Sequence, residues 1–392
     1  MASNGTGSIA RDPGQYEVTP VELFFDLVYA FAISQLSHFL LEHLSWVGLA
    51  ESIVLYLAVF WAWAFTTWAT SLTDPRRAPV RQMLLVSMLF GLFMNAAIPE
   101  AFGEAGWLFV ATYLAAQIGR TVWMLTAGLQ PVIHTHFQRA LIWQLAASPL
   151  WVAGAVIANG ARLLPWSLAT AVDLAGSLLA HPLPGRRLKT ERLQFAAPYL
   201  FERGRLFFLI ALGETVLTTG AAITAAHLGP MTLLTGTVAL AGTIAIWWTY
   251  FRRSERVAWR LAAENVDPAR TSRYATYSLM LMVAGLIAVA VGDELVLARP
   301  TSHTNLATNA MLYGGPALYF GSQARYMRSV VHDSPRTRLI GVVALIIVGA
   351  ATLPAPSFVA GIGAASILVG IAIADARRAE GEQAPADRTK DF

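Results

Sequence analysis

Residues 20–41 read PVELFFDLVYAFAISQLSHFLL, an apolar segment long enough to cross a membrane, with Glu22 and Asp26 in its first turns. Ionisable groups inside a membrane are costly to keep and are therefore candidates for a functional site. Four residues apart on a helix, the two acids share one face, where two negative charges in a low dielectric cannot easily both ionise. The alternative for Glu22 is structural, because Thr19 and Pro20 before an acid are typical of a helix N-terminal cap. Asp26 lies one turn further in and is the stronger functional candidate.

Composition places the whole chain in the membrane class. Hydrophobic residues make up 56% of the sequence and charged residues only 13%, and long apolar runs recur along its length. We therefore predict an all-α fold, a polytopic integral membrane protein. The absence of cysteine excludes disulfides, thiolate metal sites and a cysteine nucleophile. The net charge of +4 is modest and lies in loops, which favours contact with membrane lipids and argues against nucleic acid as a partner.

The apolar runs predict about twelve transmembrane helices. Their predicted ranges are 20–41, 46–72, 80–101, 107–128, 137–159, 163–181, 204–226, 230–251, 274–297, 305–327, 338–353 and 356–375. The first run is not typical of a cleavable signal peptide, because no basic leader precedes it. With alternating loops, nearly all basic residues fall on one side with both termini, so the positive-inside rule predicts cytoplasmic termini.

Short matches between the two parts of the chain suggest an internal repeat of two parallel six-helix halves. Gly91 precedes Glu100 by nine residues, and Gly285 precedes Glu294 by the same interval. The predicted organisation is a disordered cytoplasmic N-terminus (1–17), a first transmembrane half (18–181), a basic cytoplasmic linker (182–203), a second transmembrane half (204–376) and a disordered cytoplasmic C-terminus (377–392).

Five motifs together resemble the bacterial low-temperature-requirement A family. They are Glu22-Leu23-Phe24-Phe25-Asp26-Leu27-Val28-Tyr29, Ala97-Ile98-Pro99-Glu100, Glu202-Arg203-Gly204-Arg205-Leu206-Phe207 with Ala211-Leu212-Gly213-Glu214-Thr215, Trp247-Trp248-Thr249-Tyr250-Phe251 and Gly314-Gly315-Pro316-Ala317-Leu318-Tyr319. The resemblance covers nearly the whole chain and implies a polytopic protein of the bacterial inner membrane. The family pattern has a histidine shortly before its Glu-Arg pair, whereas Phe201 stands directly before Glu202 here.

Three further charged residues fall near the middle of predicted spans: Arg120, Asp173 and Glu214. A mid-membrane arginine costs roughly 3 kcal/mol, and a carboxylate is the usual way to offset it. We therefore expect Arg120 to pair with Asp173 or Glu214, either as part of a substrate site or only as an ion pair that fixes helix register.

Other candidates for substrate binding lie nearer the ends of the spans. Arg203 and Glu214 are eleven residues apart, three helical turns, and are predicted to lie on nearly the same side of one helix. The alternative for Glu202 and Arg203 is that they are interfacial anchors. Glu100 and Glu294 belong to the same set, or are solvated helix ends.

Aromatic residues cluster in two spans and suggest an aromatic-lined pocket, although most aromatic side chains in membrane helices are core or interface residues. The predicted pocket residues are Trp61, Trp63, Trp247, Trp248 and Tyr250. The sequence has no phosphate-binding glycine loop, zinc-protease signature or aspartate-rich magnesium motif. We accordingly predict no metal site and no cofactor.

These features leave three classes of function. The first is a proton-coupled carrier of a hydrophobic or amphipathic, lipid- or isoprenoid-like substrate, with Asp26, Asp173 and Glu214 exchanging protons and Arg120 holding an anionic head group. The second is a metal-independent intramembrane enzyme in which a buried carboxylic acid protonates, and so cyclises or isomerises, a prenyl (terpenoid) chain. The third is a cold-related membrane scaffold. A homo-oligomer is compatible with all three.

Overall fold

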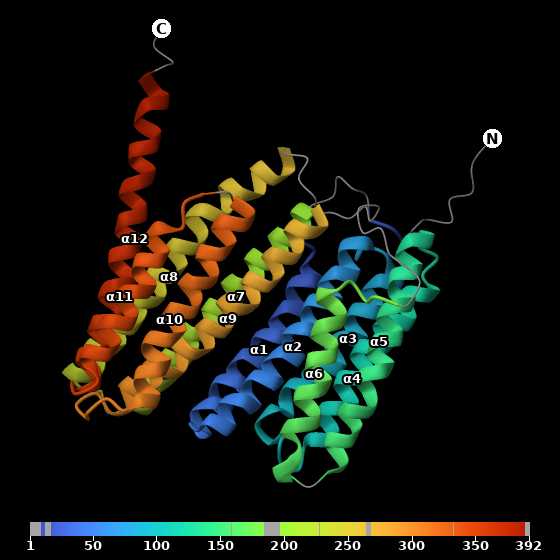
Figure 1. Cartoon of the computed structure of the whole chain (residues 1–392), viewed down its shortest axis with the longest axis horizontal. Helices are drawn as coiled ribbons and strands as arrows, with labels where there is room; N and C mark the ends of the chain where they lie inside the picture. Colours follow the sequence, from blue (N-terminus) through green and yellow to red (C-terminus); the bar gives the residue numbers. More distant parts are fainter. Residues whose placement is uncertain are drawn as a thin grey trace. The chain divides into compact units, whose positions relative to one another are not determined.

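A computed structural model describes residues 9–11, 17–157, 159–183, 197–226, 228–263, 268–331 and 333–388. Within these residues the fold is helical (Figure 1), and isolated β-bridges join Ala10 to Thr73 and His303 to Pro356. Residues 184–196 of the predicted linker and the segments 1–8, 12–16 and 389–392 lie outside the described residues.

The α-helices follow the predicted runs closely. Their bounds are α1 Pro20–Glu42, α2 Trp46–Leu72, α3 Ala78–Ala96, α4 Gly106–Thr126, α5 Pro131–Val156, α6 Leu163–Leu178, α7 Ala197–Ala225, α8 Pro230–Ala263, α9 Pro268–Ala298, α10 Leu306–Tyr326, α11 Arg336–Thr352 and α12 Ser357–Arg388. Local sequence explains several starts, because Thr19 forms a capping box with Glu22 before α1, and Ser45 and Asn305 cap α2 and α10 through their side chains.

Several boundaries differ from the sequence prediction, and α5 and α9 begin six residues early while α8 continues to Ala263. α7 begins at Ala197, so residues 197–203 are helical and do not belong to a linker. Ile9, Ala10 and Arg11 pair with the chain after α2, although we had predicted disorder for residues 1–17. α12 continues to Arg388, past the predicted end of the last span. Hydropathy alone underestimates helices whose first or last turns are polar.

Eight of the described helices are long and apolar enough to cross a membrane: α1 to α4, α7 to α9 and α12. α6 and α11 are 16 and 17 residues long, so each spans roughly 25 Å and is short against a hydrocarbon core of about 30 Å. α5 and α10 are long enough, but they carry more polar residues, including His134, His136 and Arg139 in α5. Length and composition therefore support eight membrane-spanning helices among the described residues, fewer than the twelve predicted.

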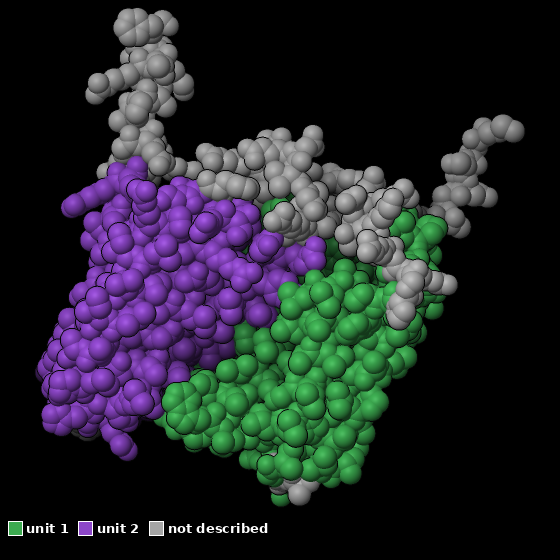
Figure 2. Space-filling model, viewed as in Figure 1, with its two compact units in different colours: residues 1–207, 267–272 green, residues 208–266, 273–392 purple. Residues whose placement is uncertain are grey.

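The chain divides into two compact units (Figure 2). Unit 1 comprises residues 1–207 and 267–272, and unit 2 comprises residues 208–266 and 273–392. Within unit 1, α4 packs on α5, α5 on α6 and α2 on α6; within unit 2, α10 packs on α11, α11 on α12 and α8 on α12. These three pairs occupy equivalent places in the helix order of the two units.

A close helix crossing within unit 2 explains two of its glycines. A Cβ atom built on Gly285 of α9 would lie 2.8 Å from the Gly315 carbonyl oxygen, and one built on Gly315 of α10 would lie 2.9 Å from the Gly285 oxygen. Only glycine permits this backbone contact. Gly91, which the sequence pairs with Gly285, lies instead against the ring of Tyr29 in α1, so these two glycines have different neighbours.

Candidate functional site: a buried charge cluster in unit 1

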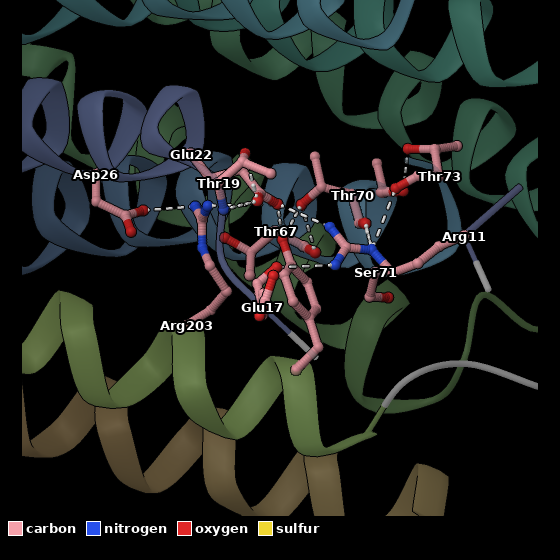
Figure 3. Close-up of polar contacts among 12 residues, drawn as sticks. Arg11, Glu17, Thr19, Glu22, Asp26, Thr67, Thr70, Ser71, Thr73 and Arg203 are labelled. Carbon is pink, nitrogen blue, oxygen red and sulfur yellow. Dashed lines mark hydrogen bonds and ion pairs between the residues drawn. The ribbon is translucent and has the colours of Figure 1, made fainter. Parts of the chain in front are cut away.

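Glu22 and Asp26 lie at the centre of a buried charge cluster, as the capping box and the one-turn spacing on α1 dictate (Figure 3). Both residues are fully buried. We name this group the Asp26 cluster and define it by five residues: Arg11, Glu22, Asp26, Tyr199 and Arg203. Two arginines and two carboxylates balance in charge, which lowers the cost of holding all four away from water.

Asp26 is held by a cation and an indole. Its Oδ1 atom accepts a hydrogen bond of 2.6 Å from Arg203 Nη2 and one of 2.8 Å from Trp63 Nε1. Trp63 in turn stacks on Phe207, with 4.1 Å between ring centroids. The second carboxylate oxygen, Oδ2, is buried without a hydrogen-bond partner in the described part of the chain, as is Arg203 Nε. Asp26 and Arg203 thus each keep an unused hydrogen-bonding position.

Glu22 is saturated by comparison. Its Oε2 atom accepts two bonds of 2.8 Å, from the backbone and the hydroxyl of Thr19. Its Oε1 atom accepts from Tyr199 Oη and, at 3.1 Å, from Arg11 Nη2, and it lies 3.7 Å from Arg203 Nη1. Glu22 therefore serves as a helix cap, as the sequence suggested, and also neutralises Arg11.

Arg11 is the member of the cluster that sequence analysis missed. Its segment pairs with the chain after α2, through Arg11 N to Leu72 O at 3.2 Å and Asp74 N to Ile9 O at 2.9 Å. The Arg11 side chain also donates to Thr70 O at 3.1 Å and lies over the Tyr199 ring, 3.8 Å from its centroid. Nothing in the polar sequence around Arg11 signals burial, because the partners come from α1, α2 and α7.

Arg203 was predicted as a substrate-binding residue on the Glu214 side of one helix, with an interfacial anchor as the alternative, and its burial corrects the alternative. It lies on α7 and its side chain is fully buried against Asp26 and Glu22. The neighbouring Glu202 is half-buried and pairs with Arg205 at 3.0 Å, which fits an anchor. Adjacent charged residues of one helix thus have opposite environments.

Arg120 forms a second polar group in unit 1, but without the expected carboxylate. Its Nη1 donates to Thr66 Oγ1 at 2.8 Å and to Ala62 O at 3.4 Å, and its Nη2 donates to Gln117 Oε1. Among the described residues it makes no ion pair, which corrects the expectation that Asp173 or Glu214 neutralises it. The link to Asp173 is indirect, because Gln117 donates to Tyr113 at 3.3 Å and Tyr113 donates to Asp173 at 2.8 Å. We name Arg120, Gln117, Tyr113 and Asp173 the Arg120 network.

Asp173 lies among aromatic side chains. Its Oδ2 atom also accepts from Trp151 Nε1 at 3.0 Å, and Trp151 lies close to Tyr113 and Trp166, with ring centroids 4.8 and 5.9 Å apart. Trp151 and Trp166 are fully buried. No described cation pairs with Asp173.

Unit 2 contains a polar network of the same residue types, which we name the Arg338 network: Arg338, Gln323, Tyr319 and Asp375. Arg338 Nε donates to Gln323 Oε1 at 2.8 Å, and Gln323 Nε2 donates to Tyr319 Oη at 2.8 Å. Arg338 Nη1 also forms an ion pair with Asp375 Oδ2. Sequence analysis named Tyr319 only within a family motif and did not predict this network, although the Tyr-x-x-x-Gln spacing in both α4 and α10 was a usable signal.

The remaining predicted residues differ in their burial and in their partners. Glu214 is half-buried and has no hydrogen-bond or ion-pair partner within the described ranges. Glu100 is exposed, as expected for a solvated end, and Glu294 is half-buried. Trp247 and Trp248 are 40% and 37% exposed, while Trp63 is buried against Asp26.

Two other predicted aromatic residues pack locally within their own units. The ring centroids of Trp61 and Phe65 are 6.2 Å apart, and Tyr250 stacks on Phe208 at 3.8 Å. Within unit 2 the ring centroids of Trp247 and Trp248 are 6.1 Å apart, and Trp247 and Tyr250 both lie close to Phe251. Among the described residues, no group of three or more histidine, aspartate or glutamate side chains is placed to hold a metal ion.

Comparison with known proteins agrees with this architecture. A family described as Bacterial low temperature requirement A protein (LtrA) matches residues 17–373. A protein of Rhizobium meliloti (strain 1021), named Uncharacterized protein RA0937, is 32% identical over 353 residues, which cover 87% of this chain and 85% of that protein. No solved structure matches the chain. The matched region includes α1 to α11, the Asp26 carboxylate and both arginine networks except Asp375, and the chain belongs to the bacterial low temperature requirement A family.

Proposed function

We propose that this membrane protein is a proton-coupled carrier of a hydrophobic or amphipathic substrate, and that Asp26 takes up and releases the proton. The observation that supports this proposal is the unequal use of the Asp26 carboxylate, because Oδ1 binds Arg203 and Trp63 while the buried Oδ2 has no described partner. A proton can be added at Oδ2 without first displacing another hydrogen-bond donor. Such intramembrane carboxylates recur in proton relays of pumps and transporters.

Protonation would change how α1 is held to the first turns of α7. Neutral Asp26 no longer forms a charge-assisted hydrogen bond with Arg203, and such bonds are roughly twice as strong as neutral ones. The Arg203 guanidinium is then left with Glu22, whose oxygen lies 3.7 Å from Nη1, or with an anionic group of the substrate. Proton binding and the position of a cation are thereby coupled within unit 1.

The proposed architecture is twelve spans in two similar six-helix halves in the bacterial inner membrane, with both termini in the cytoplasm. The matching neighbour order of α4–α5–α6–α2 and α10–α11–α12–α8 supports a repeat, as do the related Arg120 and Arg338 networks. An even number of helices per half would relate the halves by an axis along the membrane normal, as in many transporters.

The test uses full-length protein in liposomes that enclose a pH-sensitive dye. Asp26→Asn alone leaves Arg203 without its main counter-charge, so the charge-balanced double variant Asp26→Asn with Arg203→Gln is the informative one. The matched control is Glu104→Gln, which removes an exposed carboxylate from the same unit. Three fluorescent probes are offered under an inward proton gradient: a fatty acid, an anionic phospholipid and a prenyl alcohol.

We expect at least one probe to cross the bilayer with wild type and with Glu104→Gln, together with proton entry, and not with the double variant. Collapse of the gradient by a protonophore should remove the effect. Probe movement that ignores the gradient, or that survives in the folded double variant, would exclude Asp26 as the coupling group.

A second candidate function, acid-initiated cyclisation or isomerisation of a prenyl chain, is favoured by the surroundings of Asp173. This carboxyl group has no described cation and lies among Tyr113, Trp151 and Trp166, whose ring faces can stabilise a developing carbocation. Lipid extracts of a host rich in isoprenoid precursors decide between the two. A new product with wild type that disappears with Asp173→Asn supports the enzyme. If there is neither a product nor probe movement, the membrane scaffold is the remaining function class.

A further inference from the structure

Arg120 is a buried cation whose described acceptors are all neutral. Arg120 is 2% exposed, and it donates three hydrogen bonds, to a threonine hydroxyl, a backbone carbonyl and a glutamine side-chain carbonyl. Its Nε–H group is buried without a partner, and its guanidinium lies 4.8 Å from the centroid of the Phe65 ring. A buried charge without an ionic partner is expensive, so it is expected where a ligand supplies the missing charge.

Two other arginines show how this chain offsets buried guanidinium groups. Arg338 of unit 2 makes the same bond to a glutamine but also pairs with Asp375. Arg162 of unit 1 has no described carboxylate either, but it lies before α6 and donates to the carbonyls of Ala101, Gly103 and Ile157 at the ends of other elements, where the helix dipole favours a cation. Arg120 has neither form of compensation.

We propose that Arg120 binds the carboxylate or phosphate head group of an amphipathic anion. A guanidinium presents paired N–H donors that match carboxylate and phosphate oxygens. Arg120 lies within α4, away from its ends, and the hydrophobic residues around this span disfavour a free hydrated anion. An anion that carries its own apolar chain fits this setting, because the chain contacts apolar helix surface while the head group reaches the arginine.

The Gln117 side chain is the acceptor that such a head group would replace. Its Oε1 atom accepts from Arg120 Nη2, while its amide nitrogen is held by a bond of 3.3 Å to Tyr113, longer than the equivalent 2.8 Å bond in unit 2. Thr66 and Ala62 O, by contrast, belong to the α2 backbone turn that Thr66 closes through its own 2.8 Å bond. Anion binding by Arg120 does not depend on carrier activity. Only its biological role, to bind the anionic substrate of the carrier, rests on the proposed function.

The test is a binding measurement on the full-length protein in a neutral detergent, without any proton gradient. The probes are dodecanoate and dodecyl phosphate, with acetate and inorganic phosphate as the same head groups without a chain, and dodecyltrimethylammonium as a cation of equal chain length. Affinity is measured from the change in tryptophan fluorescence and from the shift in apparent Tm. The variants are Arg120→Met and the surface control Arg81→Met, which reports non-specific attraction to basic residues.

We expect dodecanoate or dodecyl phosphate to stabilise wild type and Arg81→Met, and to bind Arg120→Met at least about thirtyfold more weakly, the size of loss seen when one partner of a buried charged pair is removed. Equal binding to Arg120→Met, or an equal response to the cation, overturns the proposal. If acetate and inorganic phosphate bind as tightly as the long chains, the anion site stands and its source is a free anion.

A second variant keeps the proposal testable if Arg120→Met does not fold. Gln117→Glu places a carboxylate beside the guanidinium in the position of a competing anion, so it should abolish binding while Arg120 remains. Retained binding in Gln117→Glu would overturn the proposal as well. Because no step requires proton movement, loss of carrier activity through Asp26 and loss of anion binding through Arg120 can be observed separately.

Discussion

The Arg120 network and the Arg338 network are made from the same residue types, an arginine, a glutamine, a tyrosine and an aspartate, and they differ in where the aspartate binds. In unit 2 Asp375 pairs with the arginine, whereas in unit 1 Asp173 binds the tyrosine at the far end of the chain of hydrogen bonds. In the Arg338 network the charge of the arginine is neutralised by Asp375. The Arg120 network leaves a cation and an acid separated by Gln117 and Tyr113, which makes both available for function.

The largest expected effect tests whether the Arg338 pair is structural. Arg338→Met leaves Asp375 buried without its cation and should destabilise the protein by about 3–5 kcal/mol, as for other broken buried pairs. Arg120→Met removes a cation that has no ionic partner, so it should cost less than about 1 kcal/mol or stabilise the protein. Apparent Tm and denaturant titration of the two purified variants would compare them, and equal destabilisation would contradict the distinction between the networks.

A second contrast applies the same reasoning inside unit 1, between a buried and an exposed arginine–glutamate pair of equal length. Arg11–Glu22 and Arg76–Glu17 both measure 3.1 Å, but the first pair is buried and the second is exposed. Arg11→Ala should cost about 3 kcal/mol because it leaves two buried acids, Glu22 and Asp26, to share Arg203, and Arg76→Ala less than about 1 kcal/mol. The measurement is unfolding in detergent at low and high salt. A similar cost for the two would show that the Arg11 segment is not anchored by its charge.

The smallest expected effect comes from making unit 1 resemble unit 2. Gln117→Glu gives Arg120 a carboxylate partner and should stabilise the protein by about 1 kcal/mol, less than a full ion pair because the glutamine bond to Tyr113 is lost. Gln323→Glu adds a second acid beside Asp375 and should destabilise the protein. We expect Gln117→Glu to raise the apparent Tm and Gln323→Glu to lower it. Shifts of the same sign would mean that Arg120 is already neutralised in the wild-type protein.

Helix positions and the membrane class could be read from the sequence, because both follow from composition and local periodicity. Apolar runs predicted α2 with its observed bounds and α1 to within one residue at its end. The early starts of α5 and α7 could not be predicted, since His134, His136, Glu202 and Arg203 make these turns polar. Such turns are helical because their polar side chains find partners or lie at the surface, and hydropathy carries no information on partners.

The candidate site was predicted only in part. Glu22, Asp26 and Arg203 were each singled out, yet the expected partners were different, with Asp26 treated apart from Arg203 and Arg120 paired with an acid. Charge alone indicates that a buried arginine needs a compensating acid. It does not indicate which of several acids in the sequence pairs with Arg120 or with Arg203. Geometry decided that Arg203 compensates Asp26 and that Asp173 binds Tyr113.

By itself the sequence determined that this chain is helical and membrane-embedded, where the apolar part of each helix lies, and that Glu22 caps the first helix. These properties depend on contacts between residues close in the chain and on the water-avoiding surface of each segment. Only the tertiary structure decided which charges neutralise one another, because Arg11, Asp26 and Arg203 are far apart in sequence and meet through the packing of α1, α2 and α7. The same packing left Arg120 without an acid.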